Sequence, residues 1–265
     1  MGYADLHIHT IYSVDGTASV PTVLKYAAHH TDLDVIAITD HDEISGALQA
    51  CDLATQYGID VIPGIEITSR DGHILGLWLE ANIPAGLSAA ETVQRIGDQG
   101  GLAIAAHPMA RGGAHGLGAQ EIHNLLNHPD LAAVLVAIET YNAGLIYTRH
   151  SNQEARLLAE KLPVAQVANS DAHTPWMIGS GRTKFSGATA WELRRALLQG
   201  LTRPVLQQDL SSPLIFLDWL AFYSLRLAGF TLENLAPEKG FSLARCSHPL
   251  PDLRDLFSPG YQPAR

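Results

Sequence analysis

The sequence predicts a parallel α/β barrel followed by a C-terminal extension, and three observations support this fold class. Seven short apolar runs alternate with helix-like segments, which is the pattern of repeated β-α units. Histidines and carboxylates cluster at the ends of these runs, and barrels carry their chemistry on loops at the carboxyl ends of strands. A length of 265 residues is enough for one large domain with an appendage.

An open, doubly wound sheet is the alternative architecture. Ligands drawn from nearly every strand favour a closed barrel, because an open sheet would spread them too widely. The strands expected from the apolar runs are Ala4–Ile8, Val35–Thr39, Val61–Ile65, Ile74–Leu79, Leu102–Ala106, Val134–Glu139 and Val164–Ala168.

The helices expected between these strands have recognisable ends. Ser19 followed by Pro21 is a good N-cap and first turn, and Gly58 fits a C-terminal cap. The expected helices are Ser19–His30, Glu43–Tyr57, Ser88–Gln99, Ala119–Leu126, His150–Lys161 and Thr189–Gly200.

The pattern changes after about Pro204, which divides the chain into a barrel, residues 1–205, and an extension, residues 206–265. Leu214–Phe230 is a long apolar stretch with two charged residues, too polar and slightly too short for a membrane span. We expect a helix there, packed on the barrel or on a second subunit, and no membrane contact. From Ala236 onward, Pro, Gly and polar residues predict an irregular tail.

The charge and cysteine content limit the classes of partner. A formal net charge of −10 indicates no positively charged surface that would attract a nucleic-acid backbone, so no stable nucleic-acid complex is expected. A phosphorylated substrate is still compatible, because bound metal ions can invert the local field. The two cysteines are far apart and the N-terminus resembles no signal segment, which predicts a cytoplasmic protein. Residues 214–230 are the surface expected to be buried in any homo-oligomer.

Histidines and acids at the strand ends point to a metal site. His7 and His9 are two residues apart, which directs both side chains to one face of a strand, and Asp171 and His173 repeat this spacing. Imidazole and carboxylate groups are ligands of divalent metals, and leaving so many unpaired at a barrel mouth would be costly. The other members of the set are His41, Glu66, His73 and His107.

Seven short motifs occur in order along the chain. They are Asp-Leu-His-x-His-Thr (5–10), Ser-x-Asp-Gly (13–16), Thr-Asp-His-Asp (39–42), Pro-Gly-x-Glu (63–66), His-Ile-Leu-Gly (73–76), Ala-His-Pro (106–108) and Ser-Asp-Ala-His (170–173). This set resembles the PHP superfamily, the polymerase and histidinol phosphatase family, in its branch of small metal-dependent phosphoesterases. The resemblance spans roughly residues 3–205 and implies a distorted (β/α)7 TIM-like barrel with a trinuclear site at its mouth.

The resemblance implies three divalent metal ions, and mixed imidazole and carboxylate ligation suits manganese, iron or zinc. Asp15 stands where some family members have histidine, and its carboxylate oxygen makes the site more favourable for hard metal ions. The implied ligands are His7, His9, Glu66 and Asp171 for the first metal, Glu66, His73 and His107 for the second, and Asp15, His41 and His173 for the third.

Other residues are expected to support this site. Arg111 follows Ala-His-Pro, where related enzymes often carry arginine, and would pair with a phosphate and neutralise its charge during catalysis. Glu139 ends the sixth expected strand and is a candidate for either substrate contact or ligand orientation. The further candidates are Arg182 and His115 for substrate contact, and Asp5, Asp40 and Asp42 for orienting imidazole N–H groups.

The predicted reaction is hydrolysis of a phosphate monoester, with the metals polarising the phosphate and activating water for in-line attack. His173 or His41, unless fully occupied as ligands, or a metal-bound water would protonate the leaving alkoxide. The short spacings from Glu66 to His73 and from His73 to His107 leave no room for an inserted cap domain. An open mouth and a small organic phosphate or nucleotide are therefore expected.

Three other functions compete with this prediction. A histidinol-phosphate phosphatase would use the same ligands, and a panel of phosphate esters would distinguish it. A 3′–5′ exonuclease or oligonucleotide phosphodiesterase fits the family but not the acidic charge. A non-catalytic, metal-binding regulatory barrel should have lost motif positions, and this sequence has lost none.

Overall fold

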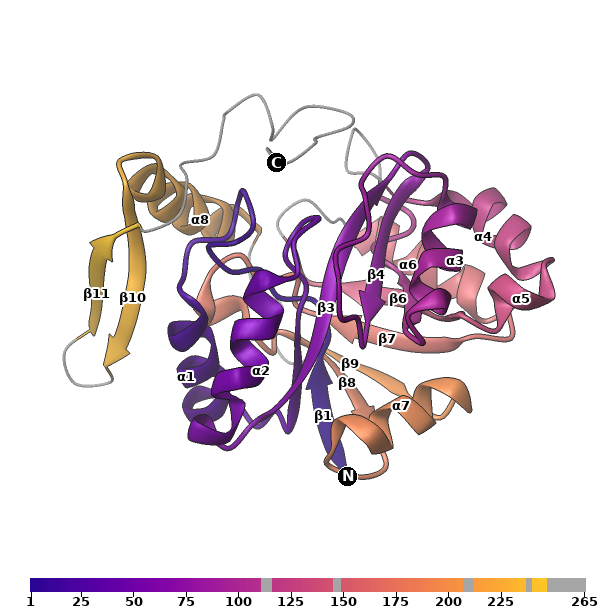
Figure 1. Cartoon of the computed structure of the whole chain (residues 1–265), viewed down its shortest axis with the longest axis horizontal. Coiled ribbons are helices and arrows are strands. Elements are labelled where there is room, and N and C mark those ends of the chain that lie inside the picture. Colours follow the sequence, from indigo (N-terminus) through magenta and orange to yellow (C-terminus); the bar gives the residue numbers. More distant parts are fainter. Residues whose placement is uncertain (111–115, 145–148, 207–211, 237–239, 247–265) are drawn as a thin grey trace.

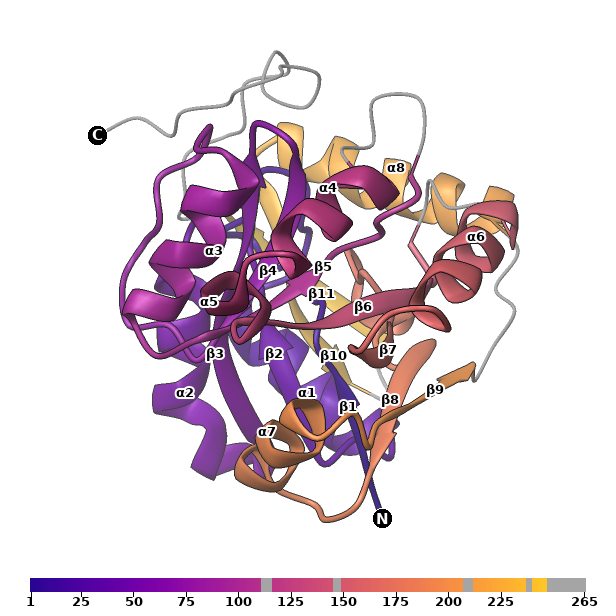
Figure 2. The ribbon, with the colours of Figure 1, turned by 90° about the vertical axis from the view of Figure 1, so that its right-hand side faces the viewer.

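The computed structural model describes residues 1–110, 116–144, 149–206, 212–236 and 240–246. A single nine-stranded sheet curves into a nearly closed barrel, in the order β7-β6-β5-β4-β3-β2-β1-β8-β9 (Figures 1 and 2). All seven expected strands are present, which confirms the predicted barrel. The strands are β1 (Gly2–Asp5), β2 (Val35–Ile38), β3 (Asp60–Ser69), β4 (Gly72–Leu77), β5 (Leu102–Ala105), β6 (Leu135–Asn142), β7 (Ala165–Asn169), β8 (Gly181–Phe185) and β9 (Arg203–Leu206).

Helices cover the outside of this sheet and begin at side-chain caps. The Ser19 hydroxyl accepts from the Thr22 N–H at the start of α1, and Ser88 with Glu91 forms a capping box at the start of α3. Helices α1 and α2 lie side by side on one flank, and α3, α4 and α5 lie on another (Figure 1). The helices are α1 (Val20–His30), α2 (Ser45–Tyr57), α3 (Ala89–Asp98), α4 (Gly118–Leu126), α5 (Pro129–Ala132), α6 (Arg149–Ala159), α7 (Ala190–Leu198) and α8 (Ser212–Leu227).

Strand β4 distorts the barrel, because it runs antiparallel to both of its neighbours, β3 and β5. Only Arg70 and Asp71 separate β3 from β4, and two residues can close a hairpin but cannot form the crossover that a parallel pair needs. The expectation of a fully parallel sheet is therefore wrong at β4. The added strands β8 and β9 are antiparallel as well and extend the sheet beyond β1.

The barrel closes just beyond the last residues of β1 and β7. Ile8 and Ala172 form a parallel bridge there. The His9 N–H donates to the Ala172 carbonyl at 2.9 Å, and the Ala172 N–H donates to the His7 carbonyl at 3.2 Å. Closure therefore brings residues 7–9 and 171–173, which lie at opposite ends of the barrel sequence, into direct contact.

The C-terminal extension packs on the barrel as a helix and a hairpin. Helix α8 lies where an apolar helix was expected, and β10 (Phe230–Ala236) pairs antiparallel with β11 (Gly240–Arg245). The prediction of an irregular tail from Ala236 onward is wrong for β11. A register shift between Leu232 and Asn234 interrupts the alternation of apolar residues in β10, so this strand does not indicate a hairpin partner.

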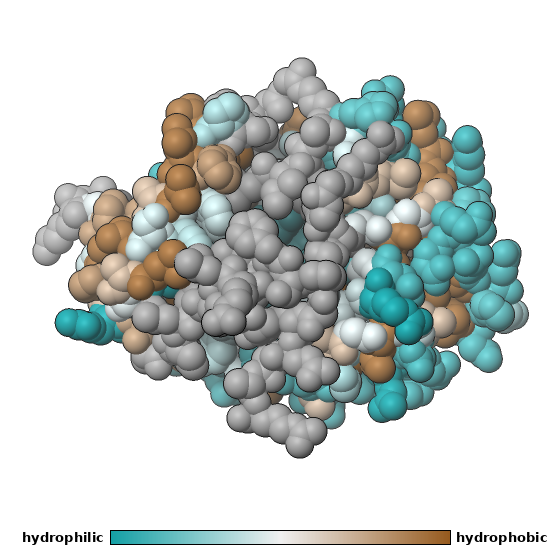
Figure 3. Space-filling model, turned by 90° about the horizontal axis from the view of Figure 1, so that it is seen from above, coloured by the Kyte–Doolittle hydropathy of each residue, from teal (hydrophilic) through white to brown (hydrophobic). Residues whose placement is uncertain are grey.

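One face of α8 is apolar and exposed, with Leu214, Phe216, Leu217 and Leu220 all open to solvent. Figure 3 shows brown, hydrophobic side chains gathered on the side of the molecule that carries the extension. Among the described residues, α8 and every other helix is too short or too polar to cross a lipid bilayer.

Candidate metal centre

The nine predicted ligands lie together at the barrel end where β1, β2 and β7 terminate. Six of them are buried, and the other three, Asp15, His41 and His173, are partly exposed. The cluster therefore has one side that faces solvent. His7 and His9 follow β1, Asp15 lies before α1, His41 follows β2, Glu66 lies in β3, His73 lies in β4, His107 follows β5, and Asp171 and His173 follow β7.

The first group consists of two imidazoles, those of His7 and His9, that face one oxygen of Glu66 and one oxygen of Asp171. His7 Nε2 lies 2.9 Å from Glu66 Oε2 and 3.4 Å from Asp171 Oδ1. His9 Nε2 lies 3.2 Å from each of the same two oxygens. All four ligand atoms lie within 4.8 Å of one another, a spacing at which they could hold one metal ion.

Glu66 joins this group to a second group. Its other oxygen, Oε1, lies 2.8 Å from His73 Nδ1 and 2.8 Å from His107 Nε2. His41 Nδ1 also approaches Glu66 Oε2 at 3.4 Å, so the carboxylate touches imidazoles from four segments of the chain. A bridging carboxylate between two ions requires this two-sided arrangement.

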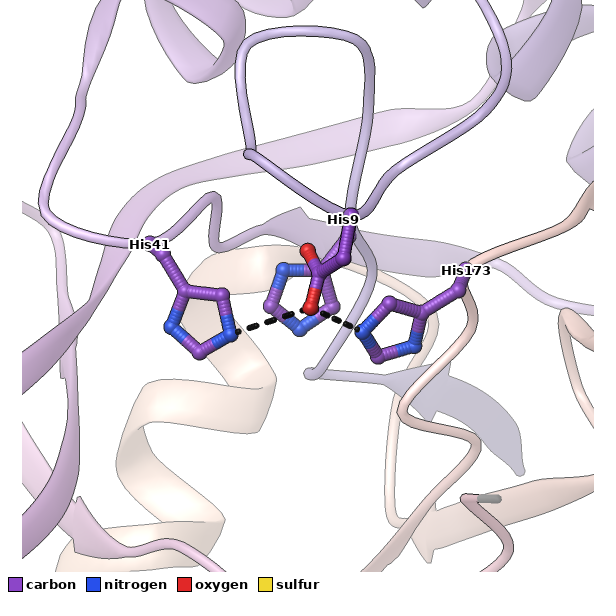
Figure 4. Close-up of side chains that lie close together, drawn as sticks. His9, His41 and His173 are labelled. Carbon is purple, nitrogen blue, oxygen red and sulfur yellow. Dashed lines mark hydrogen bonds and ion pairs between the residues drawn. The ribbon is translucent and has the colours of Figure 1, made fainter. Parts of the chain in front are cut away.

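The third group is the one that faces solvent. Asp15 Oδ2 lies 2.9 Å from His173 Nε2 and 3.5 Å from His41 Nε2. His9 also lies in this group, and its ring stacks against His173 at a centroid distance of 4.4 Å (Figure 4). Both ring nitrogens of His173 and His41 are directed to oxygen atoms, which favours ligand roles for them over the general-acid role considered above.

Ser13 favours one tautomer of the neutral His9 ring, and sequence reasoning missed it although it begins the Ser-x-Asp-Gly motif. The Ser13 hydroxyl donates to Asp15 Oδ1 at 2.8 Å, so it must accept from His9 Nδ1–H at 3.2 Å. The Nε2 atom of His9 then carries a lone pair. That atom is buried and lies 3.2 Å from one oxygen each of Glu66 and Asp171, yet it makes no well-directed hydrogen bond among the described residues, which fits a metal ligand.

Glu139 is a buried acceptor that orients His7. Its Oε1 accepts from His7 Nδ1 at 2.9 Å and from the Asn169 amide at 2.7 Å. Its Oε2 accepts from the His107 N–H at 2.7 Å and from the Asn142 amide at 3.0 Å. The carboxylate is 1% exposed and receives four hydrogen bonds, a pattern that favours the orienting role over the substrate contact.

We expect Glu139→Gln to weaken metal binding by about 10- to 100-fold, the usual cost of removing a group that orients a metal ligand. The amide would place its NH2 group against two of the four donors, and so would weaken the hold either on the His7 ring or on the His107 backbone. Elemental analysis after dialysis against a fixed manganese concentration measures this effect. Wild-type metal content in Glu139→Gln would contradict the orienting role.

The three other acids expected to orient imidazoles instead bind backbone N–H groups. Asp40 accepts from Thr10 N–H at 2.5 Å, and Asp42 accepts from Thr68 N–H at 2.7 Å. Asp5 accepts from the N–H groups of residues 170 and 179 at 3.0 and 2.8 Å, and from that of residue 7 at 3.5 Å. These carboxylates fix the loops that carry the ligands, not the imidazole rings.

The charges of the cluster are strongly coupled. Burial opposes protonation of His41, but Glu66 and Asp15 outweigh it and raise its pKa to about 10. Burial likewise opposes protonation of His173, yet Asp15 and Asp171 raise its pKa to about 9. Burial holds the pKa of His73 down to about 4 although Glu66 favours its charged form. Without metal, protons therefore neutralise the carboxylates, and a divalent cation would replace them.

Three residues at or beside ligand positions adopt a backbone conformation that is uncommon for non-glycine residues. His107, Asp171 and Asp42 have φ angles of 29°, 51° and 54°. Such conformations cost free energy and persist where surrounding contacts determine them. Here the hydrogen bonds that Glu139 and Asp42 accept provide such contacts.

Of the proposed phosphate-binding residues, Arg182 is described and does not join the cluster. The Arg182 guanidinium pairs with Asp32 and lies 4.1 Å from the centre of the Tyr3 ring. Tyr3 lies within β1, before the strand end that carries the ligands, so Arg182 is not directed into the site. Arg111 and His115 lie outside the described residues.

The fold and this cluster together define an α/β barrel with a histidine- and carboxylate-rich centre of the kind that binds divalent metals. The family model of the PHP domain matches residues 5–162, and that of a PHP-associated region matches residues 149–202. The chain therefore belongs to the PHP family, as the motifs indicated.

Known proteins similar to this chain include both uncharacterised and named relatives. The uncharacterised protein MJ1587 of Methanocaldococcus jannaschii is 42% identical over 114 residues, which are 40% of this chain and 67% of that protein. A phosphoribosyl 1,2-cyclic phosphate 1,2-diphosphodiesterase of Eggerthella lenta is 37% identical over 87 residues, about a third of each chain. A two-domain protein of Bacteroides vulgatus containing a predicted PHP-like metal-dependent phosphoesterase has a similar fold, with a TM-score of 0.61 and 20% identity. That similarity covers 91% of this chain and 74% of the other.

Proposed function

We propose that this protein is a metal-dependent phosphoesterase that hydrolyses phosphate monoesters of small organic molecules or nucleotides at a trinuclear centre. The observation that carries this proposal is the position of Glu66, whose two oxygens contact imidazoles of separate ligand groups. Membership of the PHP family supports the same reaction class.

Three groups of side chains support a centre of three metal ions, although the geometry groups His41 with Glu66 and His73, and His107 joins them through its 2.8 Å contact with Glu66. His7, His9, Glu66 and Asp171 would hold one ion, Glu66, His73 and His107 a second, and Asp15, His41 and His173 a third. When bound, the ions would supply a Lewis acid for the phosphoryl group and a nucleophile formed from water near neutral pH. Manganese, iron and zinc all suit this donor set.

The chain's own side chains would orient the centre and admit the substrate. Glu139 and Ser13 hold His7 and His9 in the tautomers that leave Nε2 free as a ligand. The partly exposed side formed by Asp15, His41 and His173 is the approach for a phosphate group. Between His73 and His107 the chain forms the rest of β4, then α3 and β5 with their connections, which supports an open mouth without a cap domain.

The test is a panel of phosphate esters with protein loaded with manganese, zinc or iron(II). It should include nucleoside monophosphates, a nucleoside 3′,5′-bisphosphate, histidinol phosphate and simple sugar phosphates. We expect hydrolysis of at least one monoester, with release of inorganic phosphate that stops when the metal is chelated. A fully loaded protein that hydrolyses none of them would contradict the proposal.

Phosphodiester hydrolysis is the second candidate, and the similarity to the cyclic phosphate diphosphodiesterase favours it. A cyclic phosphodiester and a dinucleotide therefore belong in the panel. Faster cleavage of these diesters than of any monoester would assign the centre to this second reaction class.

A further inference from the structure

The loop that carries Asp15 is held from outside by the C-terminal extension. This loop, residues 10–18, folds back on itself so tightly that a Cβ atom at Gly16 would lie 1.9 Å from the Thr10 carbonyl oxygen. Its fold turns several carbonyl groups outward. Asp15 can reach His41 and His173 only if this loop keeps its position, because both distances depend on it.

Five hydrogen bonds from the extension satisfy four of those outward carbonyl groups. The Arg226 guanidinium donates to the carbonyls of Gly16 and of Ile11, the latter at 2.7 Å. Trp219 Nε1 donates to the Asp15 carbonyl at 3.1 Å. The backbone N–H of residue 232 and the hydroxyl of residue 231 both donate to the carbonyl of residue 17, at 3.0 and 3.1 Å.

Arg226 is a charged residue buried on an otherwise apolar helix. It is only 2% exposed, and burying a guanidinium costs free energy unless its N–H groups are used. The planar fork of arginine can serve two carbonyl groups at once, whereas lysine presents a point charge. Both of those carbonyls belong to the Asp15 loop.

We propose that α8 and β10 position the Asp15 loop, and that Arg226 is a positioning residue for the metal subsite of Asp15, His41 and His173. The proposal rests on the metal centre described above. It assigns a role in the site to residues 212–236, which lie outside both matched family regions. The chain's own extension would thereby determine the geometry of the subsite nearest to solvent.

Manganese titration of the purified, full-length protein tests this inference without any substrate. Arg226→Met keeps side-chain bulk but removes the donors, and it should weaken one manganese equivalent by about 10-fold or more while the tighter equivalents stay bound. Trp219→Phe removes a single hydrogen bond and keeps the aromatic ring, so a smaller loss at the same equivalent is expected. Arg245→Met, an exposed position on β11, is the matched control and should bind manganese as the wild type does.

Asp15→Asn separates this inference from the proposed function. Suppose that Asp15→Asn weakens the binding of one manganese equivalent. If the folded Arg226→Met and Trp219→Phe variants bind that equivalent with wild-type affinity, the positioning role is overturned and the metal centre stands. If Asp15→Asn also binds all equivalents normally, the assigned subsite itself is wrong. Should Arg226→Met fail to fold, the Trp219→Phe titration decides the question.

Discussion

Replacing His9 with alanine should lower kcat/KM for phosphate-ester hydrolysis by about 1,000-fold or more. His9 Nε2 approaches oxygens of both Glu66 and Asp171, and its ring also borders the subsite of Asp15. Its loss therefore affects two metal positions. A bound metal supplies several kcal/mol of transition-state stabilisation, and about 1.4 kcal/mol corresponds to tenfold in rate.

Asp171→Ala should have a similar effect, because Asp171 is one of two carboxylates in the buried first group. The matched control is His123→Ala, which removes an exposed imidazole on α4 far along the chain from every ligand. Steady-state kinetics with added manganese, circular dichroism and elemental analysis together measure rate, fold and metal content. Normal hydrolysis by both His9→Ala and Asp171→Ala would show that the site is assigned wrongly.

The sequence predicted which side chains converge because the rule behind that prediction is geometric. Residues two apart on a strand share a face, and the carboxyl ends of barrel strands share a mouth. The pairs at 7 and 9 and at 171 and 173 therefore had to meet once the barrel closed, and the Ile8–Ala172 bridge brings them together.

The same geometry explains why Asp40 and Asp42 were misinterpreted. On extended backbone, the neighbour of His41 points to the opposite face from His41 itself, so Asp40 reaches the loop after β1. Asp42 has a φ of 54°, and its side chain accepts from the backbone of β3. Adjacency in sequence indicated a shared imidazole, whereas both acids bind backbone N–H groups.

The groups that orient the ligands could not be read from the sequence. Ser13, Asn142 and Asn169 are residue types that occur in any turn, and their roles depend on side-chain directions within one loop or strand, or between the paired strands β6 and β7. The role of Arg226 was equally hidden, because a single charge in an apolar helix does not identify its partner. The contacts of His7 with Glu139 and of Arg226 with Ile11 join segments more than a hundred residues apart, and only the closed fold specifies them.

Without metal, the protein should lose stability as the pH rises from about 6.5 toward 9. His41 and His173 have folded-state pKa values of about 10 and 9, and nearby acids also raise the pKa of His7 well above its usual value, against the effect of burial. In the unfolded chain these histidines lose their protons near pH 6.5. Above that pH the folded state binds more protons than the unfolded state, so unfolding becomes easier by about 1.4 kcal/mol per pH unit for each proton.

His73 does not oppose this trend in the same range. Its folded-state pKa is about 4, so it favours folding increasingly from pH 4 to 6.5 and contributes no further slope above that. The depressed pKa values of Asp15 and Glu66 add stability that is lost only in acid, below their unfolded values near 4. The three raised histidines therefore dominate the pH dependence between 6.5 and 9.

Metal binding should reverse the sign of this dependence. A metal ion displaces the protons from the histidines, and its affinity rises with pH because the ligands must be deprotonated. At a fixed excess of manganese, the stabilisation by binding then grows with pH. Urea unfolding of the chelated and manganese-loaded protein at pH 6.5 and 8.5 measures both slopes.

Asp15→Asn should flatten the metal-free slope, because the carboxylate raises the pKa of both His41 and His173. Equal metal-free stability at the two pH values would mean that the cluster does not hold those protons and that its charges are not coupled as the distances indicate.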